Sequence, residues 1–490
     1  MESKHTALIL VDEKIRDLFC NLYFKHLLEQ QGIKVILANR DTFTRYLDLL
    51  DFDIVISPAH QFFRSLEQER KVTEKAYHYI ISTEGAVFGK RNFIHKYCGT
   101  VTDDALAREY CRLVKKVFLW GQYSLDILAE LEFYKKEQLM VTGSPRIHFV
   151  KYYKTRQAPS NTFPVGFVSR LGGFNPYHSY GHNRFRFLDN YRNAGGYFYD
   201  ENRNLEDFMW LEHATARLTF EFLDECQRRG IRVLYRPHPR EDLGNYDYFK
   251  EKYKDIIDFS YADMPFELWV EKVSCVVSFN STTFYETLYA GIPNITLTPL
   301  IGERLYDHLK LETFHYPVRD YVYNPESMDD ALRAIEQVRE GKDLRVSGKE
   351  EEDMFRHIQE IYSAYGEGIA YEKIVQEVAK DMRDKEKRSK ARYFWFALKA
   401  KLVEFILNMF FSIKYFIFPK KNYGPAFVLN AAKEEKKYKK VIQEYDAYFK
   451  MAAEKDLWSG NKQNMQKRTA SSGGEGGHVQ NERNSGCMKI

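Results

Sequence analysis

Three hydroxyl-bearing residues follow a short apolar run near the middle of the chain. The run Ser274–Ser278 is predicted to form a buried strand, and Ser281, Thr282 and Thr283 stand where the next helix should begin. The first turn of a helix carries backbone N–H groups that have no partner inside the helix, and these groups attract anions. The spacing therefore predicts a site for a nucleotide phosphate at this turn.

Glu286, three residues beyond Thr283, has two alternative roles. Its carboxylate can accept hydrogen bonds from ribose hydroxyls, as acidic residues do in dinucleotide-binding folds. Alternatively, Thr283 and Glu286 form a capping box that only satisfies the first amides of the helix. The sequence Gly291-Ile-Pro293 then ends the helix ahead of the predicted strand Asn294–Leu297. The pattern leaves both roles of Glu286 open.

A second polar loop, Arg236-Pro-His-Pro239, follows the predicted strand Ile231–Tyr235. Proline lacks a backbone N–H group and has a fixed φ, so His238 lies in a stiff segment between Pro237 and Pro239. A rigid loop that carries a histidine and an arginine at a strand end suits a phosphate. A His-Pro pair by itself usually marks only a turn, but two such loops at the ends of neighbouring strands indicate one shared nucleotide site.

Group transfer at such a site usually also needs a base that removes a proton from the acceptor. Glu84 follows the predicted strand Tyr79–Ser82 directly and precedes Gly85, so its carboxylate is expected to project from a strand end into a cleft between domains. A glutamate before a glycine is common in ordinary loops, so the placement alone does not establish a base. Weaker candidates near other strand ends are Asp12, Glu13, His60, Ser144 and Arg146.

Short apolar runs alternate with longer helical stretches, a pattern typical of parallel sheets with crossover helices. It predicts an α/β protein with two Rossmann-like domains, 1–150 and 163–382, which face each other across a cleft. The remaining predicted strands are Ala7–Val11, Lys34–Ala38, Asp53–Ser57, Val117–Trp120, Leu139–Thr142, Val165–Val168 and Ile256–Phe259.

Helical periodicity covers Glu206–Arg229, Ser327–Glu340 and Glu350–Met382. The last of these helices is expected to cross back to the first domain. The stretch Leu171–Asn204 is rich in Gly, Asn, Tyr and Arg and has little periodicity, so it is interpreted as a loop on the donor side or a lid.

The net charge is only +4, from 73 basic and 69 acidic side chains, so no overall field favours nucleic acid as a partner. Six cysteines are scattered without the close pairs of a zinc site, and no signal peptide precedes the first predicted strand. These features predict a cytoplasmic protein. No metal or cofactor motif appears, since Asp51-Phe-Asp53 precedes its strand and is poorly placed to hold a metal at the cleft.

The segment 383–458 combines many cations with many aromatic residues. Within its apolar part, Tyr393–Phe418, the longest charge-free stretch is Phe405–Ile413, which is far shorter than the roughly 20 apolar residues of a spanning helix. We therefore expect the part 383–421 to lie in the interface of an anionic membrane. The alternative is a helix packed on the protein with a solvated basic face. Residues 459–490 have the composition of a disordered tail.

The motifs Thr83-Glu84-Gly85 and Arg236-Pro-His-Pro239, followed by the block Ser281–Pro293, resemble bacterial surface-carbohydrate glycosyltransferases of GT-B fold. The likeness covers about residues 5–380 and is greatest to the capsule and lipopolysaccharide enzymes that use CMP-activated ulosonic acids such as Kdo and sialic acid. It implies that Glu84 is the catalytic base, that His238 binds the CMP phosphate, and that Ser281 and Thr282 complete the nucleotide site. Many relatives carry a second acidic residue where this chain has Thr83. The resemblance also implies a metal-independent reaction.

Three alternatives remain beside a CMP-ulosonate transferase that acts on a lipid-linked glycan or surface polysaccharide. A GT-B transferase that uses a UDP-sugar or CDP-glycerol would keep the same Ser and Glu block with Gly-Ile-Pro. A non-catalytic glycan-assembly scaffold would need no carboxylate at Glu84. An epimerase acting on a nucleotide sugar would not need the basic aromatic appendage.

Overall fold

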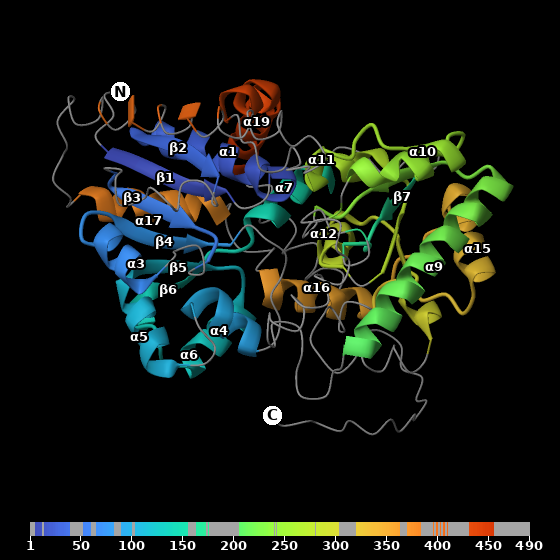
Figure 1. Cartoon of the computed structure of the whole chain (residues 1–490), viewed down its shortest axis with the longest axis horizontal. Coiled ribbons are helices and arrows are strands. Elements are labelled where there is room, and N and C mark those ends of the chain that lie inside the picture. Colours follow the sequence, from blue (N-terminus) through green and yellow to red (C-terminus); the bar gives the residue numbers. More distant parts are fainter. Residues whose placement is uncertain are drawn as a thin grey trace.

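The computed structural model contains two α/β domains side by side (Figure 1). The residues that it describes are 5–11, 14–39, 52–59, 65–82, 90–99, 103–154, 163–172, 175, 205–239, 241, 243–279, 281–302, 320–362, 370–383, the positions 395, 398, 399, 402, 405, 406 and 409, and 431–454.

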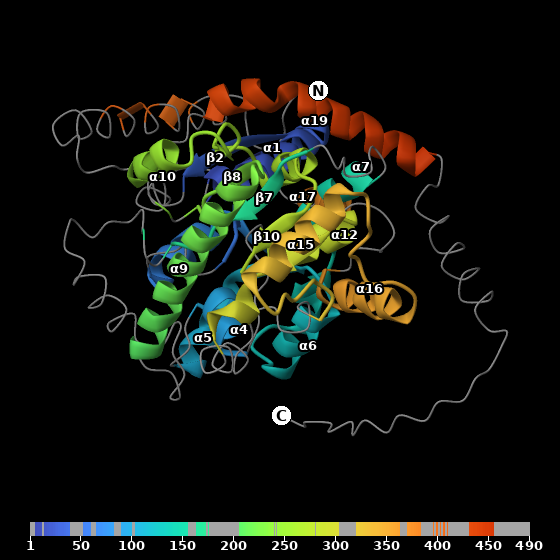
Figure 2. The ribbon, with the colours of Figure 1, turned by 90° about the vertical axis from the view of Figure 1, so that its right-hand side faces the viewer.

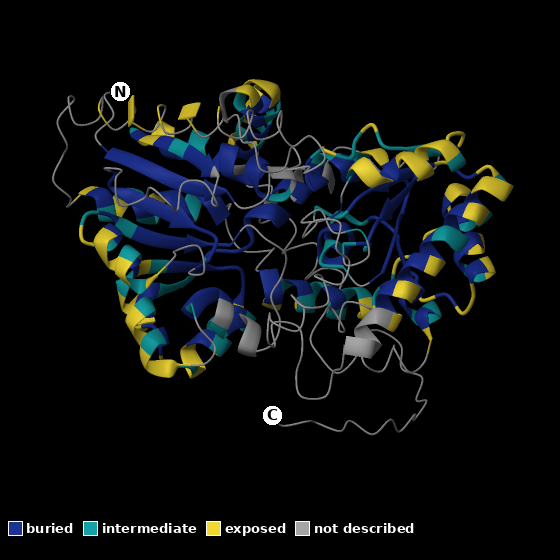
Figure 3. Ribbon diagram, in the orientation of Figure 1, coloured by how far each residue is buried: buried dark blue, intermediate teal, exposed yellow. Residues whose placement is uncertain are grey.

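The first domain is built on six parallel strands in the order β2-β1-β3-β4-β5-β6. The strands are β1 (His5–Val11), β2 (Ile33–Asn39), β3 (Ile54–Ser57), β4 (Tyr77–Ile81), β5 (Val114–Leu119) and β6 (Leu139–Val141). Every residue of β1 and β3 is buried. A parallel sheet is covered on both faces, which explains why these strands appear in the sequence as continuous apolar runs. Figure 3 shows the buried strands between helices with exposed outer faces.

The helices of the first domain cover both faces of this sheet. They are α1 (Lys14–Gln30), α3 (Leu66–Thr73), α4 (Lys90–Cys98), α5 (Asp104–Leu113), α6 (Gln122–Glu130) and α7 (Pro145–Lys154), with a short 3-10 turn at Lys136–Gln138. Polar caps mark some of their starts. Ser65 accepts a hydrogen bond from the backbone N–H of Gln68, and Asp103 accepts one from Leu106.

The second domain has five parallel strands in the order β11-β10-β7-β8-β9. They are β7 (Val165–Val168), β8 (Val233–Arg236), β9 (Ile257–Asp258), β10 (Val276–Ser278) and β11 (Asn294–Thr296). Gly166 in β7 is a point of close approach, because a β-carbon there would lie 2.5 Å from the ring of Trp269. All eleven strands predicted from the sequence are present, and the α/β fold class with two parallel sheets is confirmed.

The helices of the second domain flank this sheet. They are α9 (Leu205–Arg229), α10 (Asp247–Lys252), α11 (Phe266–Trp269), α12 (Thr283–Ala290), α15 (Met328–Arg339) and α16 (Lys349–Tyr362), with 3-10 turns at Leu243–Tyr246, Val270–Lys272 and Thr298–Ile301. The predicted single helix Glu350–Met382 is two helices, α16 and α17 (Ala370–Arg383), and residues 363–369 between them lie outside the described ranges.

Helix α17 returns to the first domain, which confirms the predicted crossing. Its apolar residues join the core cluster that includes α1 and the first sheet. Lys116 of β5 donates a hydrogen bond to Glu377 over 2.5 Å, and the Tyr79 hydroxyl of β4 donates one to Asp381 over 2.9 Å. The first domain is therefore completed by a helix from the far end of the second.

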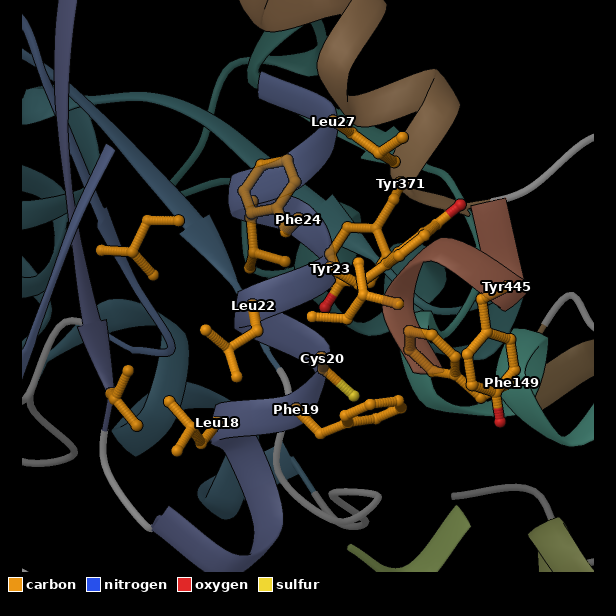
Figure 4. Close-up of a cluster of buried hydrophobic side chains, with 14 of the residues drawn as sticks. Leu18, Phe19, Cys20, Leu22, Tyr23, Phe24, Leu27, Phe149, Tyr371 and Tyr445 are labelled. Atoms are coloured by element: carbon orange, nitrogen blue, oxygen red, sulfur yellow. The ribbon is translucent and has the colours of Figure 1, made fainter. Parts of the chain in front are cut away.

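A further helix, α19 (Ala431–Glu454), also packs on the first domain, against α1 and α7. Its buried apolar residues, Tyr438, Ile442, Tyr445 and Phe449, follow a helical spacing and line one face. The Tyr445 ring lies 5.1 Å from that of Phe149, and Figure 4 shows this pair beside the residues of α1. Figure 2 shows α19 running along one side of the molecule.

The position of α19 changes the interpretation of segment 383–458. In the structure, the apolar face of residues 431–454 packs against the protein core. This arrangement agrees with the alternative of a helix packed on the protein with a solvated basic face. Within the described ranges, no helix has the length and apolar character needed to cross a bilayer. The predicted tail 459–490 lies outside those ranges.

Candidate functional site

The carboxyl ends of β8, β7 and β10 meet at one edge of the second sheet. Residue pairing places Val168 of β7 opposite Arg236 on one side and Ser278 on the other. The two polar loops of the sequence analysis therefore do not follow adjacent strands, because β7 lies between them. The chain runs outward from β7 through β8 to β9 and then returns to β10, so the strand order reverses between β7 and β10. Ligands of open parallel sheets bind at such a point.

Helix α12 begins at this edge with Thr283, preceded by Ser281 and Thr282, and all three residues are half-buried. The Ser281 hydroxyl lies 2.8 Å from the Thr283 hydroxyl and accepts a hydrogen bond from the Thr283 backbone N–H over 3.2 Å. Thr282 is the N-cap residue, and its side chain makes no capping bond. The predicted capping box of Thr283 and Glu286 is therefore not formed. The backbone N–H groups of Thr283, Phe284 and Tyr285 instead donate to the Ser281 hydroxyl, the Ser281 carbonyl and the Thr282 carbonyl.

Glu286 is bound by an arginine of the other domain. Arg146, near the start of α7, places its Nε 2.7 Å from one carboxylate oxygen of Glu286, and its Nη2 donates to the other over 3.2 Å. Glu267 of α11 lies 3.6 Å from the same Nε. Burial raises the pKa of Glu286, while the charge of Arg146 opposes the shift. The structure thus joins two residues that the sequence analysis placed separately, one at the ribose and one in the cleft.

The Arg236 guanidinium also lies inside the protein. Its Nη1 donates to the Met264 carbonyl over 2.6 Å, and it lies 5.5 Å and 5.8 Å from the ring centres of Phe266 and Trp269. Burial lowers the pKa of Arg236 to about 10. These contacts favour a role in holding α11 against the sheet, and a direct contact of Arg236 with a nucleotide stays a prediction.

The His-Pro loop leaves β8 at the same edge. Pro237 is buried, whereas His238 and Pro239 are half-buried. The His238 carbonyl accepts a hydrogen bond from the backbone N–H of Glu241 over 2.9 Å, which closes the loop as a turn. The imidazole therefore sits on a short anchored turn two residues beyond the strand.

Glu241 is a buried carboxylate that the sequence analysis did not single out. One of its oxygens accepts hydrogen bonds from the Ser169 hydroxyl over 2.8 Å and from the Leu171 backbone N–H over 2.6 Å. The other oxygen accepts a hydrogen bond from the Tyr246 hydroxyl. Burial raises the pKa of Glu241 to about 7. Glu241 thereby ties the loop after β7 to the loop after β8, and its place three residues after His238 was the only sequence signal for it.

Glu84 and Gly85, with the weaker candidates Asp12, Glu13 and His60, lie outside the described ranges. The strand that leads to Glu84 is nevertheless well anchored. The carbonyl of buried Ser82 accepts a hydrogen bond from the Trp120 indole over 2.7 Å. Trp120 stacks on Tyr362 with ring centres 5.0 Å apart, and Tyr362 lies 4.8 Å from the ring of Tyr285 in α12. The rings of Trp120, Tyr362 and Tyr285 therefore form a chain of contacts from the end of β4 to α12. The role of Glu84 stays a prediction.

Ser144 lies in the same domain interface. It is fully buried, and its backbone N–H donates to the Tyr362 carbonyl over 3.0 Å. In the part of the chain that the structure describes, no cluster of His, Cys, Asp and Glu could hold a metal ion, and five of the six cysteines are buried there outside any disulfide. His238 and the three hydroxyls at the start of α12 are thus the nucleotide-site candidates that lie at the same edge of the second sheet.

Comparison with known proteins connects this edge to a family. Residues 210–298 match the model of the family described as alpha-2,8-polysialyltransferase (POLYST). The matched segment begins in α9 and contains β8, the His-Pro loop, β10 and α12. No curated protein matches the chain significantly. The family match supports a glycosyltransferase that acts on a surface glycan.

Several solved structures are similar to the chain over most of its length. UDP-GlcNAc 2-epimerase of Methanocaldococcus jannaschii, in complex with UDP-GlcNAc and UDP, has 11% identity and a TM-score of 0.43, over 76% of this chain and 99% of that one. The wall teichoic acid polymerase TagF has 11% identity and a TM-score of 0.46, over 78% and 90%. MnaA of S. aureus with UDP has 12% identity and a TM-score of 0.41, over 79% and 99%.

Proposed function

We propose that the chain transfers a sugar of the ulosonic acid class, such as sialic acid or Kdo, from a CMP-activated donor to a surface polysaccharide or a lipid-linked glycan. The observation that carries the proposal is the position of His238 and the start of α12 at one sheet edge, within the segment that matches the polysialyltransferase family model. A CMP donor presents one phosphate group to that edge.

In this reaction, an acceptor hydroxyl attacks the anomeric carbon of the donor sugar, and the bond from that carbon to the phosphate oxygen breaks. The electron pair of that bond leaves with CMP. The hydroxyls at the start of α12 and the His238 side chain stabilise the growing negative charge of the phosphate. Glu84 takes the proton of the acceptor hydroxyl. The reaction needs no metal or other cofactor, because protein groups meet the charge of the leaving CMP.

The donor is tested by calorimetric titration of the purified protein with CMP, UDP and CDP. The proposal expects binding of CMP with clear preference over UDP and CDP. A preference for UDP or CDP would instead assign a UDP-sugar or CDP-glycerol donor. If the protein binds none of the three, it is not a nucleotide-dependent transferase, and a scaffold role becomes the better explanation.

We also propose that the protein works at the cytoplasmic face of an anionic membrane, held there by residues 383–421. The described positions in this part include six exposed apolar side chains, which follow helical spacing: Trp395, Leu398, Leu402, Phe405, Ile406 and Met409. An apolar stripe of this kind beside many cations is typical of helices that lie in a lipid interface. The neighbouring helix α19 adds exposed lysines, among them Lys436 and Lys440.

Vesicle flotation tests this second part. The variant Leu402→Ser/Phe405→Ser/Met409→Ser should lose binding to vesicles that contain anionic lipid, while its CMP binding stays intact. Truncation at residue 383 is unsuitable, because it would also remove α19 from the core. Unchanged flotation of the triple variant would refute the lipid contact.

A further inference from the structure

A half-buried arginine stands between the two polar loops of the site. Arg170 lies two residues beyond Val168 of β7, the central strand of the three. Since Val168 pairs with Arg236 and with Ser278, the equivalent positions on the flanking strands lead to His238 and to the turn at Ser281. Arg170 is therefore at the point where the strand order reverses.

The backbone on both sides of Arg170 is fixed by buried hydrogen bonds. Glu241 accepts hydrogen bonds from the Ser169 hydroxyl and from the Leu171 backbone N–H, and the Tyr235 hydroxyl donates to the Ser169 hydroxyl over 2.9 Å. The Ser169 backbone N–H also donates to the Arg236 carbonyl over 2.9 Å. A residue held on both sides in this way has its position set before a ligand arrives, which lowers the cost of binding.

The side chain of Arg170 has no assigned task in the fold. Other arginines buried near the sheet edge are paired, Arg146 with Glu286 and Arg236 with the Met264 carbonyl. For Arg170, in contrast, the described part of the structure provides no hydrogen bond, ion pair or ring contact. A partly desolvated guanidinium without a carboxylate partner attracts an anion more strongly than a fully hydrated one does.

We propose that Arg170 binds an anionic group of the donor, either the nucleotide phosphate or the carboxylate of the sugar, and so is a donor-binding residue. The proposal rests on the proposed function, since it takes a nucleotide-activated sugar acid as the ligand. A guanidinium offers two parallel N–H donors to a phosphate or a carboxylate, so the two anions are alternatives for one contact. Arg170 would complete a row of His238, Arg170 and the start of α12 along the sheet edge.

The test compares the wild type with Arg170→Gln and Arg170→Lys, using calorimetric titration with cytidine, CMP and a CMP-activated sialic acid. Arg232→Gln is the matched control, because Arg232 is an exposed arginine at the opposite, amino-terminal edge of the same sheet. Arg170→Gln should weaken binding of the CMP-activated sialic acid about 10-fold or more, whereas the lysine variant should retain part of the affinity. Cytidine binding and the control variant should be unchanged. The melting temperature of each variant shows that the fold is intact.

The outcomes of this test distinguish the phosphate from the carboxylate as the ligand of Arg170. They also distinguish a failure of this inference from a failure of the proposed function. Weaker binding of CMP by Arg170→Gln assigns Arg170 to the phosphate. A loss confined to the CMP-activated sugar acid assigns it to the carboxylate. Wild-type affinity for both ligands in Arg170→Gln would overturn this inference and leave the proposed function standing. A wild type that binds neither ligand would overturn both.

Discussion

The Arg146 guanidinium lies 2.7 Å from the Glu286 carboxylate, and this buried pair connects α7 of the first domain with α12 of the second. Both side chains are at most 6% exposed, so neither charge is hydrated when the other is removed. The hydroxyls of the proposed nucleotide site lie at the start of the same helix α12. The ion pair therefore fixes this edge of the second sheet relative to the first domain.

Removing one partner of this pair should destabilise the protein strongly. We expect Arg146→Met to lower the free energy of unfolding by about 3 to 5 kcal/mol, because it leaves Glu286 buried without its cation. Replacing both residues, as in Arg146→Met/Glu286→Leu, should restore only part of the loss, because buried Glu267, 3.6 Å from the same guanidinium, also loses this cation. Urea unfolding measures the free energy of unfolding of the single and the double variant. Arg217→Ala, which breaks an exposed pair with Glu221, is the control and should cost only about 0 to 1 kcal/mol. Equal effects of Arg146→Met and the control would contradict the prediction.

His238→Ala should weaken CMP binding, because a hydrogen bond to a charged phosphate contributes about 1.5 to 3 kcal/mol. The expected loss of affinity is on the order of 10- to 100-fold, measured by calorimetric titration. His213, exposed on α9, offers a matched His→Ala control that should leave affinity unchanged. If His238→Ala binds CMP as the wild type does, His238 is not part of the site.

The stability of the protein should depend on pH through Glu241. Its pKa rises from the ordinary 4.5 to about 7 in the folded protein because burial disfavours the charged form. The folded state therefore binds the proton more tightly, and the stability from this group is complete below pH 4.5 and lost as the pH rises through 7. Glu241→Gln should remove this loss of stability at higher pH. The difference between wild type and variant in free energy of unfolding should shift by roughly 1 to 3 kcal/mol between pH 5 and pH 8. Parallel pH profiles of the two proteins would refute the prediction.

The docking of α19 on the first domain can be tested at its buried aromatic residues. Phe449 is 1% exposed, and Phe449→Ala should lower the free energy of unfolding by about 3 to 5 kcal/mol through the cavity it leaves. Tyr448, its half-buried neighbour, is the control, and Tyr448→Ala should cost clearly less. Amide hydrogen exchange should also become faster along α19 in the Phe449 variant. Unchanged exchange together with unchanged stability would show that α19 is not docked.

Much of the fold was predictable because buried parallel strands and amphipathic helices leave local patterns. Val165–Val168 is an example, a short apolar run whose bounds are the same in the prediction and in the structure. The order of strands is not a local property, and the prediction that both polar loops follow adjacent strands was wrong because β7 lies between β8 and β10.

The positions of single candidate residues at strand ends were predictable, whereas contacts between candidates that are distant in the sequence were not. His238 and Ser281 stand at strand ends, as expected from the sequence. Glu286 was assigned to ribose or to a capping box, but its partner Arg146 is 140 residues away, and no local pattern could show that contact. The network of Glu241 was missed for the same reason, because it depends on Ser169 and on Tyr246 from two different loops.

The return of α17 and α19 to the first domain has a consequence for biosynthesis. The face of α1 that carries Phe19 and Tyr23 is covered by Tyr371 of α17 and by Tyr445 of α19. On the ribosome, α1 is made more than 300 residues before these helices emerge. An apolar surface of the amino-terminal domain therefore stays uncovered while the whole second domain is synthesised. During that interval the domain is open to chaperones and to misassembly, and its folding is complete only after α17 and α19 have been made.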